Sequence, residues 1–285
     1  MTLEYWYMLP VAILVATTAM ASGVEGATFF APIFILALRL PPEVAIGVGL
    51  ITEVFGFASG LFAYARKRLI DYQLGSRLLL VTVPLALLGT WLGTSIAPDV
   101  LKTILGVGLF ALALTFLRAP DHGDMTLLDG AIAAEHGPGK GQTKLVTATG
   151  EEIWYTVCNK NEGRLISGIG ALFMGMISTG LGEMNGYFLL QRCRVPSKVA
   201  VATSVLIVAV TALVASAGHF YSFLQQGPET LNVVYSLVIF IIPGVIVGGQ
   251  LGSAVANRIP QSLLMRGLGV LFALVAALTL GEVIL

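Results

Sequence analysis

The chain has 285 residues, of which 56% are hydrophobic and only 11% are charged. Soluble domains carry about 25% charged residues, so this composition excludes an ordinary soluble protein and indicates an integral membrane protein. The formal net charge is zero, which gives no reason to expect a nucleic-acid partner. No motif for a cofactor or for ATP is evident, and two cysteines are too few for a disulfide framework.

Eight apolar stretches follow one another along the chain. They are too long for buried core helices and lack the alternation of barrel strands, so they predict an all-α polytopic membrane protein. The N-terminus lacks the basic segment of a signal peptide, and none is expected. The stretches fall near residues 8–38, 43–64, 76–97, 100–117, 165–191, 196–218, 231–256 and 263–284.

A polar insert at 118–164 separates the first four stretches from the last four and is too charged to span a membrane. Its segment KLVTATGEEIWYTV favours a small β-hairpin that turns near Gly150. The rest reads as loop, in which His122 and His136 lack metal-ligand spacing, so no metal site is expected. Two roles stay open for the insert, a cytoplasmic lid and an element that docks a partner.

The two membrane parts, 1–117 and 165–285, resemble each other and predict an internal duplication, a construction common in membrane transporters. Four pairs of segments carry the similarity: PLALLGTWLG (84–93) with PGVIVGGQLG (243–252), LGVGLFALAL (105–114) with LGVLFALVAA (268–277), LPPEVAIGVGL (40–50) with RVPSKVAVATSV (194–205), and SGVEG (22–26) with STGLGE (178–183).

The positions of lysine and arginine discriminate between two topologies, because these residues gather on the cytoplasmic side. If all eight stretches cross the membrane, nine basic residues face seven and no orientation is preferred. If the first and fifth stretches instead enter and return at their glycines, fourteen lie on one side and only Arg39 and Lys102 on the other. This predicts two inverted repeats in the cell (inner) membrane, each a re-entrant broken-helix hairpin followed by three transmembrane helices. Both termini are then outside and the insert is cytoplasmic.

The two hairpin tips, 23–28 and 179–186, are expected to face each other near the midplane. Helix N-termini favour anions, and glycine lets a ligand approach the backbone amides. The alternative is that the glycines only permit tight packing. The expected substrate-binding residues are Gly23, Glu25, Gly26, Thr28, Ser178, Thr179, Gly180, Gly182, Glu183, Asn185, Thr203 and Ser204.

Three acidic residues, Glu25, Glu53 and Glu183, are expected deep in the bilayer. A charged side chain at the centre of a spanning helix costs about 2.5–3.5 kcal/mol. These residues are therefore candidates for proton coupling, or for excluding a wrong anion when ionised. For Glu25 and Glu183 the alternative is that a protonated carboxyl caps the hairpin by bonding free amides.

Other features indicate packing and anchoring. The Gly-x-x-x-Gly pairs at 56–60, 89–93 and 248–252 predict close contact inside the molecule or, as an alternative, a homodimer face. The segment QRCR (191–194) is expected to anchor at the membrane interface or to attract anions, and Cys193 to be an inert thiol or one that reacts with a sulfur ligand. His219 is placed at an outer helix end without a nucleophile partner, so an intramembrane enzyme is not expected.

The pattern resembles the TauE/SafE family of sulfite exporters, also called the toluene-sulfonate uptake permease family. The resemblance is carried by SGVEGATFFAPIFILALRLPPEVAIGVGL (22–50), by its second copy STGLGEMNGYFLLQRCRVPSKVAVATSV (178–205), and by the GxxLG segments at 89–93 and 248–252. It covers almost the whole chain except the insert. It implies a secondary transporter of small sulfur oxyanions such as sulfite or organosulfonates, commonly an exporter, with proton coupling.

The tips depart from the glycine runs of that family. Glu25 and Ala27 interrupt the first tip, Glu183 and neighbouring residues replace most of the second, and the second lacks a counterpart of Pro32. A carboxylate in each tip would select a protonated or larger ligand, such as a sulfonate with an organic tail. The alternatives are an anion channel of the same fold and a transporter for another small carboxylate or oxyanion.

Overall fold

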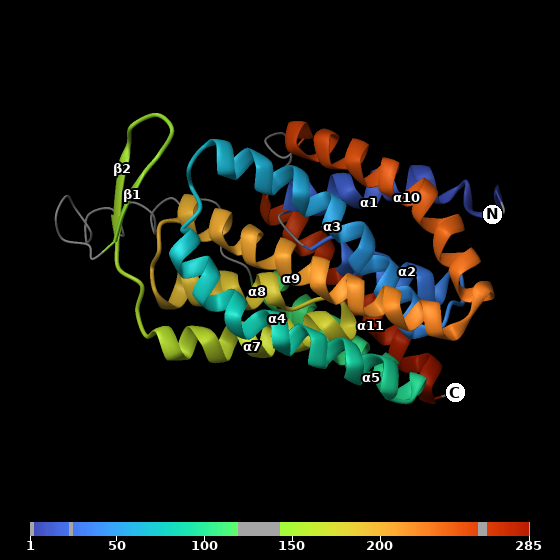
Figure 1. Cartoon of the computed structure of the whole chain (residues 1–285). Helices are drawn as coiled ribbons and strands as arrows, with labels where there is room; N and C mark the ends of the chain where they lie inside the picture. The colour runs from blue at the N-terminus through green and yellow to red at the C-terminus, as the bar shows by residue number, and fades with distance from the viewer. Residues whose placement is uncertain (1–2, 23–24, 119–142, 256–260, 285) are drawn as a thin grey trace.

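The computed structural model describes residues 3–22, 25–118, 143–255 and 261–284, and in these ranges the chain is largely helical (Figure 1). Its elements in chain order are η1 (Leu3–Tyr5, a 3-10 turn), α1 (Met8–Ser22), α2 (Ala27–Leu36), α3 (Pro42–Arg66), α4 (Tyr72–Ser95), α5 (Pro98–Leu117), β1 (Thr143–Val146), β2 (Glu152–Tyr155), α7 (Lys160–Ile177), α8 (Leu181–Gly186), η2 (Tyr187–Arg192, a π-helix), α9 (Ser197–Gln226), α10 (Pro228–Val255) and α11 (Gln261–Ile284).

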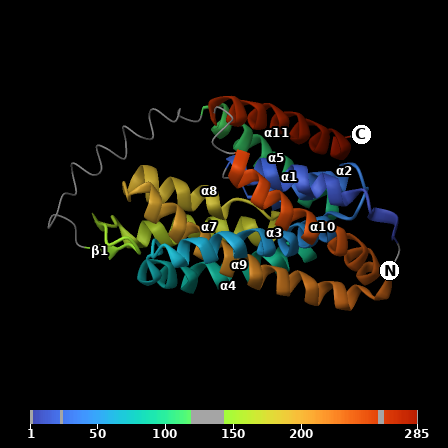
Figure 2. The same ribbon diagram turned by 90° about the horizontal axis from the view of Figure 1, so that it is seen from above.

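Six of the described helices are long and apolar enough to cross a membrane: α3, α4, α5, α9, α10 and α11. They correspond to the six stretches for which the basic residues predict a crossing, which confirms a polytopic membrane protein. The helices run side by side along one direction (Figures 1 and 2). Helix α5 has 20 residues and α9 has 30, so at 1.5 Å per residue they are about 30 Å and 45 Å long.

The remaining two apolar stretches are broken helices. We call α1 with α2 the first hairpin, and α7 with α8 and η2 the second hairpin. The break in the second lies at Ser178 and Gly180, which have left-handed φ angles of 59° and 113°. Helix α8 begins at Leu181, within the predicted tip 179–186, because the Glu183 carboxylate accepts from the Gly180 amide at 3.2 Å and caps the first turn.

Each hairpin packs against the other half of the chain. Helix α1 lies along α10 and α7 along α4, while α5 packs on α11 and α3 on α9. The contacts are close because glycines line them: a Cβ at Gly89 would overlap the Leu172 carbonyl oxygen, and one at Gly248 would overlap that of Ile13. The interpretation of these Gly-x-x-x-Gly segments as internal packing faces is confirmed.

The connection after each hairpin has the same backbone conformation in both halves. Arg39 and Arg194 adopt left-handed φ angles of 53° and 51°. In both connections the amide of the residue after the arginine donates to the carbonyl six residues earlier. The following helix then starts directly after a proline, Pro41 or Pro196, whose φ and ψ agree within a few degrees.

The β1–β2 hairpin lies at the end of the molecule opposite the two chain termini (Figures 1 and 2). Its strands are antiparallel, and Gly150 has a φ of 83° in the turn, which confirms the predicted hairpin. The hairpin is docked rather than free: the buried Tyr155 hydroxyl donates to Asp71 at 2.7 Å, and the Ala148 amide donates to the Lys67 carbonyl at 3.0 Å. His122 and His136 lie outside the described residues.

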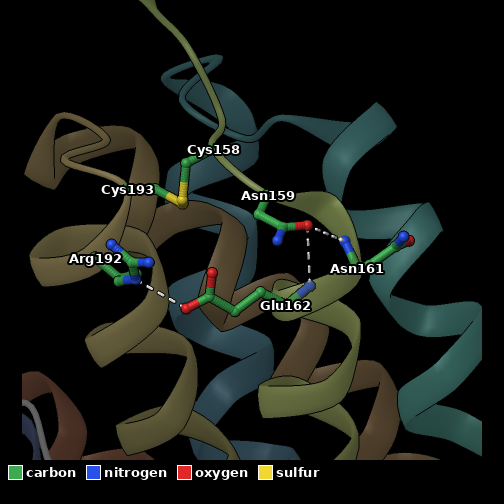
Figure 3. The surroundings of a disulfide bond; sticks show 6 residues. All are labelled: Cys158, Asn159, Asn161, Glu162, Arg192 and Cys193. Atoms are coloured by element: carbon green, nitrogen blue, oxygen red, sulfur yellow. Dashed lines mark hydrogen bonds and ion pairs between the residues drawn. A yellow bond between two sulfur atoms is a disulfide. The ribbon is translucent and has the colours of Figure 1, made fainter.

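A disulfide between Cys158 and Cys193 joins the two chain ends of the second hairpin (Figure 3). The prediction that Cys193 is a free thiol, inert or reactive, is therefore wrong: the return leg of the hairpin brings it back to the residues that precede α7. Beside the disulfide, the Arg192 side chain at the end of η2 forms an ion pair with Glu162 in the first turn of α7, at 2.8 Å. This pair joins the two legs of the second hairpin.

Candidate functional site

The two hairpin tips meet in the interior, as the sequence predicts. We use "tip" for residues 25–28 of the first hairpin and 178–183 of the second. The Thr28 hydroxyl donates to the Thr179 hydroxyl at 2.8 Å, and the Gly182 amide donates to the Glu25 carboxylate at 2.5 Å. Thr28 is fully buried and Thr179 nearly so. The tips therefore form one polar cluster built from both halves of the chain.

Three carboxyl groups converge on this cluster. Glu25 and Glu53 are each only 3% exposed, and Glu183 lies near enough for its charge to act on both. Both carboxyl oxygens of Glu53 and the second oxygen of Glu25 lack a hydrogen-bond partner of normal geometry. The Ala27 amide, at the start of α2, lies near Glu53. Buried carboxyl groups without partners are unusual and are typical of functional sites in membrane proteins.

Two of the carboxylates already occupy backbone amides at the start of α8. Glu25 accepts from Gly182, and Glu183 accepts from Gly180. The capping arrangement considered for both residues is therefore present. It has a chemical consequence, since an oxyanion can bind the Gly182 amide only after the Glu25 carboxylate has moved away.

Neutral donors surround the carboxyl groups. Ser178 is fully buried, and its hydroxyl has no hydrogen-bond partner. The Asn185 carbonyl accepts from the Ser167 hydroxyl at 2.7 Å, while its amide nitrogen has no partner. An unpaired buried donor normally finds an acceptor, so these two groups are suited to an oxygen-rich ligand.

Several predicted site residues fall elsewhere or have other surroundings. The Thr203 hydroxyl accepts from the Asp71 amide at 3.0 Å, so it faces the start of α4, and no described hydrogen bond joins it to the tips. Ser204 is half-buried on the same helix. Gly26 is the N-cap of α2 with ordinary helical φ and ψ angles, and a Cβ there would meet nothing within 4 Å, so glycine is not sterically required. Gly23 lies outside the described residues.

Sequence reasoning missed two contributors. Ser167 holds Asn185 from α7, and its position in the small-residue segment SGIGALFMG gave no hint of this contact. His219, expected at an outer helix end, is fully buried about two turns before α9 ends, where a ring nitrogen contacts the Gly175 carbonyl at 2.9 Å. Gly175 lies in α7, one turn before the tip, so this contact holds α7 in place next to the tip.

The six crossing helices and the buried polar cluster between the broken ones define a polytopic membrane protein with an internal polar site. The chain matches the family model described as Sulfite exporter TauE/SafE over residues 8–279. It belongs to this family of membrane transporters, which is a transporter family and not an enzyme family.

Two curated relatives carry general names. The chain is 22% identical over 240 residues to the "Probable membrane transporter protein YunE" of Bacillus subtilis (strain 168), covering 82% of this chain and 80% of that protein. It is 33% identical over 90 residues to the "Probable membrane transporter protein ORF9" of Sinorhizobium sp, covering 32% of this chain and 34% of that protein. No solved structure matches the chain.

Proposed function

We propose that this protein is a secondary transporter that exports small sulfur oxyanions such as sulfite or an organosulfonate, with the anion held between the two hairpin tips. Membership of the sulfite exporter family supports the substrate class. Contacts between the tips from both halves support the place of the site. The substrate-binding residues are those of the tips, together with Asn185.

The observation that carries the mechanism is the bond between the Gly182 amide and the Glu25 carboxylate. In the absence of substrate, the carboxylate takes the place of the oxyanion. Protonation of Glu25 removes its negative charge and weakens this bond, which frees the amide for the substrate. The nearby carboxyl groups of Glu53 and Glu183 make it costly for the anion and an ionised Glu25 to be present together. An anion therefore enters together with the proton that neutralises Glu25. This arrangement couples sulfite movement to proton movement.

Alternating access follows from inverted repeats. The matching conformations at Arg39 and Arg194 support a duplication, as do the pairs α1 on α10 and α7 on α4. The site lies between the repeats, so rocking one repeat against the other exposes it to one side at a time.

The orientation follows from the basic residues, fourteen of which lie on the side of the β-hairpin in this topology. The insert is then cytoplasmic, and both termini are outside in the cell membrane. Of the two roles open for the insert, a lid over the transporter's own helices is favoured, because the hairpin bonds to Asp71 and Lys67 of the same chain.

The test is the flux of radiolabelled sulfite into proteoliposomes, with and without a proton gradient, and with sulfate and a small sulfonate as competitors. We expect saturable flux that follows the gradient in the parent. In Glu25→Gln the neutral amide side chain cannot release a proton, so the dependence on the gradient should be lost. Glu229→Gln is the control, because this carboxylate is exposed at the start of α10.

The alternative of an anion channel predicts a different result. Flux that does not saturate and is indifferent to the proton gradient would favour it. If no sulfite is transported but a labelled sulfonate is, and sulfite competes with it, the proposed site stands and the substrate is a sulfonate.

A further inference from the structure

The second hairpin is closed by a covalent bond at the end away from its tip. Cys158 comes directly before Asn159, the N-cap of α7, and Cys193 comes directly after η2. We call their bond the hairpin disulfide. When the two halves are aligned on Arg39 and Arg194, the position of Cys193 is Leu38 in the first hairpin. The bond is therefore specific to one half of the chain.

The hairpin disulfide connects the substrate site to the docked insert. Cys158 is three residues after Tyr155, which is fully buried and bonded to Asp71 at the start of α4. Cys193 ends the leg that carries Glu183. Through the disulfide, this leg is tied to the β-hairpin and thereby to the first half of the chain. A hairpin tied in this way resists displacement relative to α4.

The surroundings of the bond suit attack by an anionic nucleophile. Cys158 is half-buried, whereas Cys193 is only 6% exposed, so Cys158 is the more accessible residue of the pair. Arg192 and Arg194 flank Cys193 in the sequence, and Arg192 is shared with the Glu162 carboxylate. A neighbouring arginine favours a thiolate as the leaving group.

We propose that the hairpin disulfide is a site of reversible covalent modification by sulfite, which releases the second hairpin when the transported anion accumulates. The inference rests on the proposed function for the identity of the anion. The sulfur lone pair of sulfite attacks Sγ of Cys158 and forms a new S–S bond, giving an S-sulfonate. The bond between the cysteines breaks, and its electron pair leaves on Cys193 as a thiolate. No other oxidant or reductant takes part.

The reaction reverses by the same path. The Cys193 thiolate attacks Sγ of the Cys158 S-sulfonate, expels sulfite and restores the disulfide. The fraction of released hairpin therefore follows the sulfite concentration. In the proposed orientation the bond is on the cytoplasmic side, where disulfides are rare and those that occur are usually transient and catalytic or redox-sensing. That is also the side from which an exporter draws its substrate.

Release leaves weaker contacts at the hairpin. The Arg192–Glu162 pair has side chains that are 55% and 27% exposed, and exposed ion pairs contribute little. The Ser167–Asn185 bond remains deeper in the hairpin. The fully buried Phe188 still packs against Gly163 of α7, so the leg 181–193 stays docked but moves more readily relative to α7, and transport becomes faster.

The experiment compares the purified protein in lipid nanodiscs after exposure to sulfite or to equal sulfate. Peptide mass mapping locates the adduct, maleimide labelling counts free thiols, and amide hydrogen exchange follows residues 181–193. We expect one sulfite adduct on Cys158, a free thiol on Cys193 and faster exchange in this leg, all reversed when sulfite is removed. The Cys158→Ser/Cys193→Ser double variant should form no adduct and exchange fast throughout.

Flux in proteoliposomes separates this inference from the proposed function. At a tracer concentration of sulfite too low to open the parent's disulfide, the double variant should carry sulfite several-fold faster than the parent. A disulfide that survives sulfite, an adduct on Cys193, or cleavage without faster exchange would each overturn the inference, even if sulfite is transported. If neither form carries sulfite, the proposed function is overturned, and mass mapping and exchange still decide whether sulfite releases the hairpin.

Discussion

Gly182 is the residue at which the two tips approach most closely. A Cβ at this position would overlap the Glu25 carboxylate, so Gly182→Ala should push the carboxylate away from the amide. We expect a destabilisation of about 1–3 kcal/mol, the usual cost of leaving a buried donor without its partner. Sulfite flux should fall strongly, because the added methyl group also occupies the proposed anion site. Thermal unfolding and proteoliposome flux measure the two effects.

The same hairpin provides the matched control. Gly186 has a helical φ of −58°, and a Cβ there meets nothing within 4 Å. Gly186→Ala should therefore keep the flux of the parent, and its unfolding temperature should not fall. Equal loss of flux in both variants would mean that alanine disturbs the helix rather than the contact with Glu25.

Tyr155 is the residue that docks the β-hairpin. A hydrogen bond to a charged group contributes about 1.5–3 kcal/mol, so Tyr155→Phe should weaken docking by this amount. We expect faster proteolysis at the Gly150 turn and faster hydrogen exchange in β1 and β2. Tyr72→Phe, at an exposed tyrosine in α4, is the control and should leave both rates unchanged.

The docking bond also has a defined pH dependence. Burial, together with the Asp71 carboxylate, raises the pKa of Tyr155 above its ordinary value of 10.0. Because the folded state favours the protonated hydroxyl, this stabilisation is complete below about pH 10 and is lost as the pH rises through the folded-state pKa. Near pH 7, Tyr155 should stay protonated, so its ionisation should not speed up amide hydrogen exchange in β1 and β2. Such a loss near pH 7 would contradict this assignment.

Some site residues were visible in the sequence and others were not. Glu25 and Glu183 stand out because carboxyl groups are costly inside apolar stretches, and Thr28 and Thr179 lie beside the glycines that break the helices. The partner of Asn185 and the pairing of Cys158 with Cys193 depend on how the legs of the second hairpin are aligned. Sequence periodicity does not specify this alignment, because a π-helix shifts the return leg out of the α-helical repeat.

At the scale of the elements, the contact between α4 and α7 depends on backbone proximity. A Cβ at Gly89 would overlap the Leu172 carbonyl, and a backbone carbonyl moves only with its helix. Gly89→Ala should therefore destabilise the protein by about 1–3 kcal/mol. At Gly267, in α11, a Cβ meets nothing, so Gly267→Ala should gain up to about 1 kcal/mol from helix propensity. Thermal unfolding in one detergent compares the two variants.

The crossing helices could be predicted because each is long and apolar and bounded by charged or proline-containing turns. The breaks in the other two stretches were indicated by glycines and by the distribution of basic residues. Most of the predicted tip 179–186 is helical, because the capping of Gly180 by Glu183 lets helix resume at Leu181. A rule based on glycine content counts Gly182 and Gly186 as loop residues, although both are helical.

At the scale of the whole molecule, the orientation in the membrane is open to a direct test. In the cysteine-free variant, a single cysteine at the exposed Glu229, at the start of α10, should react with an impermeant maleimide in intact cells. A cysteine at the exposed Ala148, in the turn of the β-hairpin, should react only after the membrane is opened. The reverse pattern would contradict the orientation derived from the basic residues.

The unequal lengths of α5 and α9 have a consequence for the surrounding lipid. Helix α5, at 20 residues, matches a hydrocarbon layer about 30 Å thick, whereas α9 has 30 residues. A helix that exceeds the layer must tilt, project from it or thicken it locally. Helix α9 packs on α3 and α4 and follows the second hairpin in the chain. The acyl-chain length of the bilayer therefore acts on the tilt of the helix beside the tips, and if the proposed rocking of the two halves is right, a thinner or thicker membrane shifts its balance.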